Sequence, residues 1–110
     1  MTNEMIAKLE TAGFKRWTKG GHDRLYASAK VLGLVCWYYK TGNISNAEFC
    51  GDEISNSEAR RMADAKTFID LRNDTVFSDN ARLAHRAAEM TGLSYDAESW
   101  DKKIELKGVA

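Results

Sequence analysis

The sequence predicts an α+β fold: a single small domain of antiparallel β-hairpins interleaved with three or four short helices. Short alternating segments are separated by turn residues, which is typical of strands joined in hairpins. Helix-capping signals lie between these segments, and a chain of 110 residues is the usual size of one domain. Hydrophobic residues make up 44% of the chain and charged residues 29%, which is enough for a core within an ordinary polar surface.

The first helix and the first hairpin are predicted from caps and glycines. Thr2–Asn3 can cap the helix, and Gly13 stands where a C-terminal cap belongs. Two strands follow, Phe14–Lys19 and His22–Tyr26. They are joined by Gly20–Gly21, a strong signal for a two-residue hairpin turn.

A short helix over Ala27–Gly33 precedes the second hairpin. Its strands are expected at Val35–Lys40 and Ile44–Phe49, with a turn at Thr41–Asn43. The first of these strands contains three consecutive aromatic residues, and these cannot all face one core.

Alternation along this strand divides the aromatic side chains between two faces. Val35, Trp37 and Tyr39 are expected to face the core. Tyr38 and Lys40 are then expected to point outward, or Tyr38 to lie half-buried beneath a helix with its hydroxyl at the rim.

The second half of the chain continues the pattern. Ser55–Glu58 has the sequence of a capping box and predicts a helix to about Lys66. Strands are then expected at Thr67–Leu71 and Thr75–Ser78 with a turn between them, followed by a helix from Ser78–Asn80 to Gly92. Residues 94–110 are expected as a loosely packed tail, with a helical turn at 96–101 and a short strand around Ile104 and Leu106.

Charge is unevenly distributed along a neutral chain. Residues 1–47 hold seven Lys and Arg against three acids, a net charge of +4, and residues 48–110 hold nine against thirteen, a net charge of −4. The basic half points to an acidic partner. The simpler expectation is that folding mixes both halves into a neutral surface, because typical nucleic-acid binders are strongly basic.

Signals for metal binding or catalysis are sparse. The only His and Cys residues are His22, Cys36, Cys50 and His85, and none has the short paired spacing of a zinc site. No glycine-rich phosphate loop and no paired carboxylates stand out. No catalytic residue, metal or cofactor is therefore expected, and the cysteines are expected as free thiols. The enzyme alternative needs His22, Asp23 and a cysteine to converge.

Aromatic residues beside cations form the candidate binding site. Trp17 lies between Lys15 and Lys19 on one predicted strand, and Tyr38 lies beside Lys40 on another. Such side chains on a sheet bind nucleic acid by stacking and phosphate contacts, and they also form hot spots for proteins. A nucleic-acid partner predicts that all five share one surface.

Arg60 and Arg61 are further candidates on the capped helix. Successive helical residues point about 100° apart, so at most one of the two faces the core. The simpler interpretation is a solvated helix face, and the sharper one is contact with an acidic partner or a nucleic-acid backbone.

Four segments carry a resemblance: Tyr38–Ser45, Phe49–Met62, Lys66–Leu71 and Thr75–Asn80. They are similar to small proteins of unassigned activity encoded in Gram-positive bacterial genomes, often near mobile elements or prophages. The resemblance covers roughly residues 13–93 and transfers no catalytic or binding residue. It implies a context in which small accessory proteins are usually binders, either regulators or inhibitors of host defence such as anti-CRISPR proteins.

We therefore expect a non-enzymatic binding protein that acts on a host protein or a protein–nucleic-acid complex. The alternatives are a nucleic-acid-binding regulator with a basic-aromatic sheet surface, and a small enzyme with a His/Asp/Cys site. For a protein partner, acids of the second half are candidates for mimicking nucleic acid: Asp52, Glu53, Asp64, Asp70, Asp74 and Asp79.

The expected location is the cytoplasm, as a monomer or homodimer without a membrane partner. The N-terminus has neither a basic leader nor an apolar stretch typical of a signal peptide. No apolar run approaches the roughly 18–20 residues of a membrane span.

Overall fold

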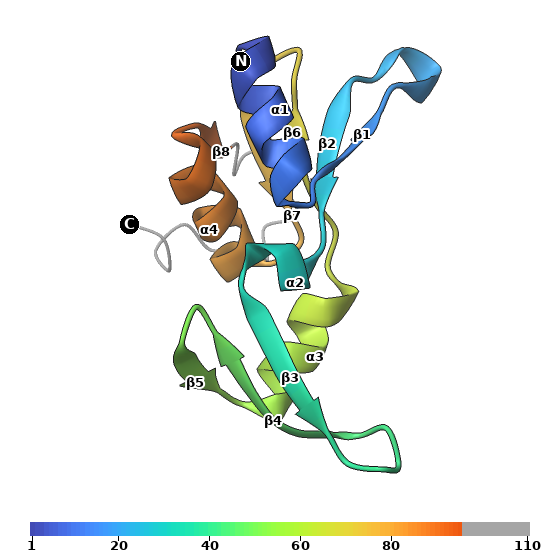
Figure 1. Cartoon of the computed structure of the whole chain (residues 1–110), viewed down its shortest axis with the longest axis vertical. Helices are drawn as coiled ribbons and strands as arrows, with labels where there is room; N and C mark the ends of the chain where they lie inside the picture. The colour runs from blue at the N-terminus through green and yellow to red at the C-terminus, as the bar shows by residue number, and fades with distance from the viewer. Residues whose placement is uncertain (96–110) are drawn as a thin grey trace.

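Four helices and two sheets form one small α+β domain, as the sequence predicts (Figure 1). The computed structural model describes residues 1–95. The elements are, in chain order, α1 (Asn3–Ala12), β1 (Lys15–Trp17), the 3-10 turn η1 (Lys19–Gly21), β2 (Arg24–Ala27), α2 (Ala29–Leu32), β3 (Leu34–Tyr38), β4 (Ile44–Phe49), β5 (Asp52–Ile54), α3 (Asn56–Asp64), β6 (Thr67–Asp70), β7 (Thr75–Ser78), α4 (Ala81–Thr91) and β8 (Ser94–Tyr95).

The two sheets are built from different parts of the chain. The large sheet has the order β1-β2-β6-β7-β8 and the small sheet the order β3-β4-β5. All pairings are antiparallel except that of β8 with β7. Because β2 pairs directly with β6, the small sheet with α2 and α3 is inserted between two neighbouring strands of the large one.

Side-chain caps fix the starts of the helices. The Thr2 hydroxyl accepts the N–H of Met5 at 3.2 Å, and the Ser55 hydroxyl accepts the N–H of Glu58 at 3.1 Å. The predicted start of α3 is thus confirmed. The Glu58 carboxylate pairs with Arg82 of α4 at 3.0 Å rather than turning back to the Ser55 amide, so it links α3 to α4.

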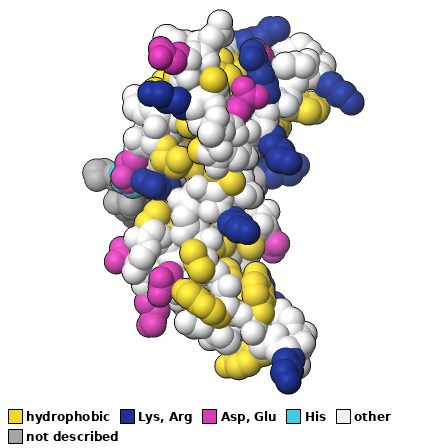
Figure 2. All heavy atoms as spheres, viewed as in Figure 1, with side chains coloured by type: hydrophobic (Ala, Val, Ile, Leu, Met, Phe, Trp, Pro, Cys, Tyr) yellow, Lys and Arg dark blue, Asp and Glu magenta, His cyan; other side chains and the backbone are white. Residues whose placement is uncertain are grey.

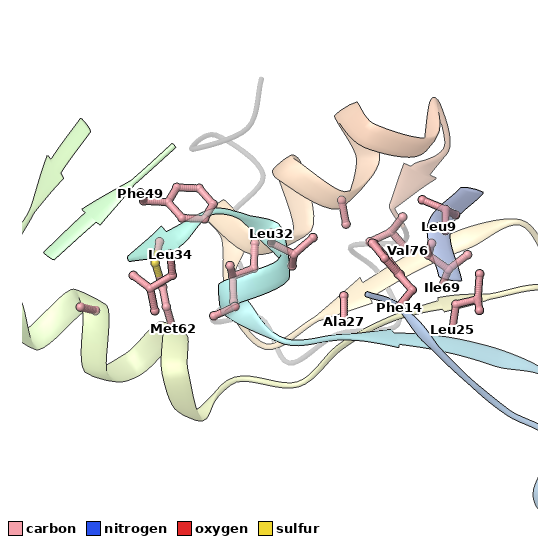
Figure 3. Packing of buried hydrophobic residues seen from close by; sticks show 14 of the residues in the cluster. Leu9, Phe14, Leu25, Ala27, Leu32, Leu34, Phe49, Met62, Ile69 and Val76 are labelled. Atoms are coloured by element: carbon pink, nitrogen blue, oxygen red, sulfur yellow. The ribbon is translucent and has the colours of Figure 1, made fainter. Parts of the chain in front are cut away.

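One hydrophobic core joins the two sheets. Leu25, Ile69 and Val76 of the large sheet belong to the same buried cluster as Met62 of α3. Leu32 of α2 is fully buried, and Figure 3 shows it between the side chains of the large sheet and those around α3 and β3. Burial of this shared cluster holds the insertion against the large sheet.

The first hairpin and the region after β4 depart from the prediction. Gly20 and Gly21, at φ 64° and 78°, lie in the 3-10 turn Lys19–Gly21, so β1 and β2 are joined by a wider loop than a two-residue turn. The segment Asp52–Ile54, predicted as a connection, forms β5 because it pairs with β4. Of the tail predicted over residues 94–110, Ser94–Tyr95 forms β8 beside β7, and residues 96–110 lie outside the described residues.

Candidate functional site

Alternation gives the large sheet two faces of different character. Leu25, Ile69 and Val76 are fully buried on the side where α1 and α4 pack (Figure 1). Their neighbours Tyr26 and Phe68 are only half-buried, because alternate side chains point to the opposite face. Phe77 and Trp17 lie on that same opposite face. We call Trp17, Tyr26, Phe68 and Phe77 the aromatic face.

The rings of the aromatic face form a continuous row across four strands. The Trp17 and Tyr26 rings meet edge to face with centroids 6.1 Å apart, and Tyr26 lies 5.1 Å from Phe68. Phe68 and Phe77 stack at 5.2 Å, and His22 stacks on Trp17 at 6.0 Å. The row follows from the register, which sets Tyr26 opposite Phe68 and Phe68 opposite Phe77.

Cations accompany this row. The Arg24 guanidinium lies 4.3 Å from the Phe68 ring centroid and donates to the Tyr26 hydroxyl at 3.0 Å. Lys15 is the register partner of Tyr26. Lys15, Tyr26 and Lys66 also line a pocket of about 340 Å³ beside Tyr26, together with residues of α2 and of the segment before β6. Guanidinium and ammonium groups therefore border the rings on two strands and on the segment before β6.

The acid on this face is engaged locally. The Asp70 carboxylate accepts the N–H of Arg72 at 3.0 Å and the side-chain amide of Asn73 at 2.9 Å. These bonds stabilise the β6–β7 turn and direct the carboxylate toward the turn rather than toward Arg24. Arg24 is the register partner of Asp70, yet its guanidinium contacts Phe68 and Tyr26 instead.

The structure divides the residues expected to share one surface. Lys15 and Trp17 lie on the aromatic face, and Lys19 lies in η1 just after β1. Tyr38 and Lys40 belong to the small sheet and its β3–β4 loop, so they form a separate surface.

The two arginines of α3 form a third group. Arg60 and Arg61 line a shallow pocket of about 490 Å³ with Asp64 and Asn56, away from the aromatic face.

Tyr26, Phe68 and Arg24 were not identified from the sequence as site residues. Their alternation with Leu25 and Ile69 was a signal, but it does not say that β2 and β6 are neighbours.

The prediction that Val35, Trp37 and Tyr39 face the core is wrong. Val35 is 49% exposed, Trp37 44% and Tyr39 61%, whereas Leu34 is buried at 6%. The reason is that Leu34 pairs with the buried Phe49 on the face covered by α3. The side chains expected in the core therefore form the outer face of the small sheet.

Tyr38 is exposed rather than covered by a helix, at 61% of its surface. The Cys36 thiol raises the pKa of its phenol, first by repulsion between the two ionised groups and then by a hydrogen bond. In Figure 2 hydrophobic side chains gather over the small sheet, with acidic side chains on the β5 side.

The residues of the enzyme alternative do not gather. His22 stacks on Trp17, and Asp23 accepts two hydrogen bonds from Arg16 at 2.9 and 2.8 Å. The thiol of Cys50 shares a pocket of about 320 Å³ with His85 of α4, not with His22. Within residues 1–95, no three His, Cys, Asp or Glu side chains form a group that could hold a metal ion. Both cysteines are free thiols, as expected.

The acids proposed as a nucleic-acid mimic are dispersed. Asp74 pairs with the N-terminal ammonium at 2.9 Å, and Asp79 accepts the N–H of Lys66 at 3.2 Å. With Asp70 held in its turn, three of the six candidates serve local structure. Asp52 and Glu53 lie on β5 and Asp64 ends α3, so the set forms no single row.

No family model, no curated protein and no solved structure matches this chain. Within residues 1–95, none of the helices is long and apolar enough to cross a membrane.

Proposed function

We propose that the protein binds single-stranded nucleic acid on the aromatic face. The observation that carries this proposal is the row Trp17–Tyr26–Phe68, bordered by Lys15 and Arg24, on the sheet face opposite α1 and α4. Sheets that present aromatic rings beside cations stack unpaired bases and neutralise phosphates.

Each group on this face has a role in the proposal. Trp17 is 39% exposed, which leaves ring surface on which a base can stack. Arg24 stiffens the neighbouring rings through Phe68 and the Tyr26 hydroxyl while it keeps donors for a phosphate. Lys15 and Lys66 border the pocket beside Tyr26, where their ammonium groups can meet a phosphate of the strand.

A single strand fits this face better than a duplex. Stacking on Trp17 requires a base whose face is free, and bases within a duplex already stack on their neighbours. The neutral chain lacks the strongly basic surface by which sequence-independent duplex binders hold two phosphate backbones. We infer modest, salt-dependent and sequence-tolerant binding.

A host protein, the partner that the sequence favours, is supported by a different surface. That surface is the edge of β3, which pairs with no strand but β4 among residues 1–95 and is separate from the aromatic face. A mobile-element accessory factor that inhibits a host defence protein would use it. The two proposals rest on different residues, so each can fail without the other.

The test uses two tryptophans of similar exposure on the two sheets. Fluorescein-labelled single-stranded and duplex oligonucleotides are titrated with the wild type, with Trp17→Ala and with Trp37→Ala, using fluorescence anisotropy. Trp37 is 44% exposed on the small sheet and is the matched control for Trp17. Far-UV circular dichroism establishes that each variant is folded.

The expected result is a loss confined to the aromatic face. Trp17→Ala should weaken single-strand binding by about 5- to 150-fold, corresponding to ~1–3 kcal/mol for one stacked base, while Trp37→Ala binds as the wild type does. Three phosphate contacts predict a salt slope of about −2, and so roughly 10- to 20-fold weaker binding between 50 and 200 mM salt. Equal losses in both variants, or no binding at 50 mM salt, would overturn the proposal.

A further inference from the structure

Within residues 1–95, the outer edge of β3 presents backbone groups that pair with no other strand. The Gly33 carbonyl accepts the N–H of Cys50 at 3.0 Å, and the Tyr39 N–H donates to the Asn43 carbonyl at 2.8 Å. In an antiparallel pair, successive residues direct their N–H and C=O alternately toward and away from the partner strand. The even-numbered residues Leu34, Cys36 and Tyr38 therefore direct their N–H and C=O groups away from β4.

No other strand takes up these groups in the part of the chain that the structure describes. β3 pairs only with β4 and is therefore an edge strand of the small sheet, whose order is β3-β4-β5. An exposed strand edge is a template for pairing with another chain, and proteins commonly protect it with charges, prolines or a covering element. β3 instead carries Val35, Trp37 and Tyr38 at 44–61% exposure.

A groove runs beside this edge. Its volume is about 560 Å³, and its walls come from α2, β3 and α3. Its lining is mostly apolar and includes Ala29, Leu34, Cys36, Tyr38 and Ala63, with Lys30 as its charged residue. A groove between a strand edge and helices is the geometry in which an extended peptide adds a strand to a sheet.

We propose that this groove binds an extended segment of a partner protein, which adds to β3 as a fourth strand of the small sheet. The segment pairs with the free N–H and C=O groups of Leu34, Cys36 and Tyr38. Every second side chain of the segment packs against the apolar lining, and an acidic group of the segment meets the ammonium of Lys30.

Length and charge favour a peptide segment over a second copy of this chain. The five residues of β3 span about 16 Å, which suits a segment of about five residues. A twofold pair of chains would present the same surface to itself. The described lining holds Lys30 and no acid, so a second copy would bring another cation where an anion is needed.

The test blocks one edge of the small sheet at a time. Proline at Cys36 removes an N–H that points away from β4, so the pairing of β3 with β4 is retained. Glu53→Pro is the matched control, because the N–H of Glu53 points away from β4 at the opposite edge of the same sheet. A displayed library of short random peptides is panned against the full chain, and enriched peptides are synthesised with fluorescein for anisotropy titration.

The enriched peptides should alternate apolar and polar residues and contain an acid. Cys36→Pro should weaken their binding roughly tenfold or more, and Glu53→Pro should leave it unchanged. Lys30→Gln should weaken binding by several-fold, and this loss of affinity should be larger at low salt than at high salt. A library that yields no binder, or equal affinity for both proline variants, would overturn the proposal.

A second measurement leaves the protein unaltered, in case Cys36→Pro does not fold. Each peptide is N-methylated at every second amide, in the two alternate sets. A peptide paired as a strand tolerates methylation of the set facing solvent and loses binding when the set facing β3 is methylated. Equal tolerance of both sets overturns strand addition. A concentration-dependent dimer that excludes the peptides would assign the edge to a second copy instead.

Discussion

Gly33 approaches Cys50 so closely that a Cβ atom on Gly33 would lie 2.6 Å from the Cys50 Sγ. The two residues are also joined by the hydrogen bond from the Cys50 N–H to the Gly33 carbonyl, at 3.0 Å. This contact fixes the junction of α2 and β3 against the β4–β5 turn. It therefore sets the position of the groove beside β3.

Gly33→Ala is expected to destabilise the protein by about 2–3 kcal/mol. The backbone at Gly33 has φ +124°, where an L side chain is strained, and the new methyl meets the sulfur atom. Gly42→Ala is the matched control, because Gly42 has φ +91° but no atom within 4 Å of its added Cβ. Its expected cost is about 1 kcal/mol. Urea unfolding measures both, and equal costs would contradict the steric contribution of Cys50.

The buried hydroxyls of Thr67 and Ser78 should be unequal in their contributions to stability. They lie 2.8 Å apart across β6 and β7, and the Ser78 hydroxyl also accepts the N–H of Asn80 at 3.1 Å. Ser78→Ala leaves two polar groups unpaired and is expected to cost about 2–3 kcal/mol, whereas Thr67→Val leaves one and should cost about 1–2. Because the two share a bond, the double variant should cost less than the sum. An additive double variant, measured by urea unfolding, would argue against the shared bond.

Leu32 should couple the unfolding of the two sheets. It is fully buried at the junction of the core, and Leu32→Ala is expected to cost about 2–5 kcal/mol. Variants that retain only Trp17 or only Trp37 report on the large and small sheets separately. The urea transitions of the two variants should coincide, as in two-state unfolding. After Leu32→Ala, both transitions should shift to lower urea concentration by the same amount.

The control for this experiment is Lys30→Ala, an exposed neighbour on the same helix. It should change stability by no more than about 0.5 kcal/mol. Two separate transitions in the single-tryptophan variants would show that the small sheet unfolds independently, against the single core described above.

Asp23 should titrate at a lower pH than an ordinary aspartate. Hydrogen bonds from the Arg16 side chain, with a smaller contribution from its charge, lower the pKa of the Asp23 carboxyl. The pair therefore stabilises the fold above the ordinary pKa of aspartate, and this stabilisation is lost as the pH falls through the lowered pKa. Carboxyl NMR titration of Arg16→Gln should show the Asp23 pKa returning toward its ordinary value. Arg60→Gln, a distant control, should not move it.

The helix boundaries and most hairpins could be predicted because their causes are local. Ser55 bonds the N–H of Glu58 three residues away, and Gly92 ends α4 in the left-handed conformation. The hairpin of β6 and β7 likewise depends on a turn between adjacent segments. The loop at Gly20–Gly21 was predicted less well, since the same two glycines also permit a 3-10 turn.

The α+β class, the helices and the alternation of side chains along most strands follow from local sequence patterns, whereas β5 was predicted only as a connection. Which side of a strand faces the core depends on the elements that pack against it. β3 has apolar residues on both sides, so its sequence does not say which side is buried. Leu34 is buried because it packs on the side of α3 and Phe49, and Trp37 on the other side is exposed. The row of Tyr26 and Phe68 exists because β2 pairs with β6 across the inserted small sheet, and no short-range pattern encodes that pairing.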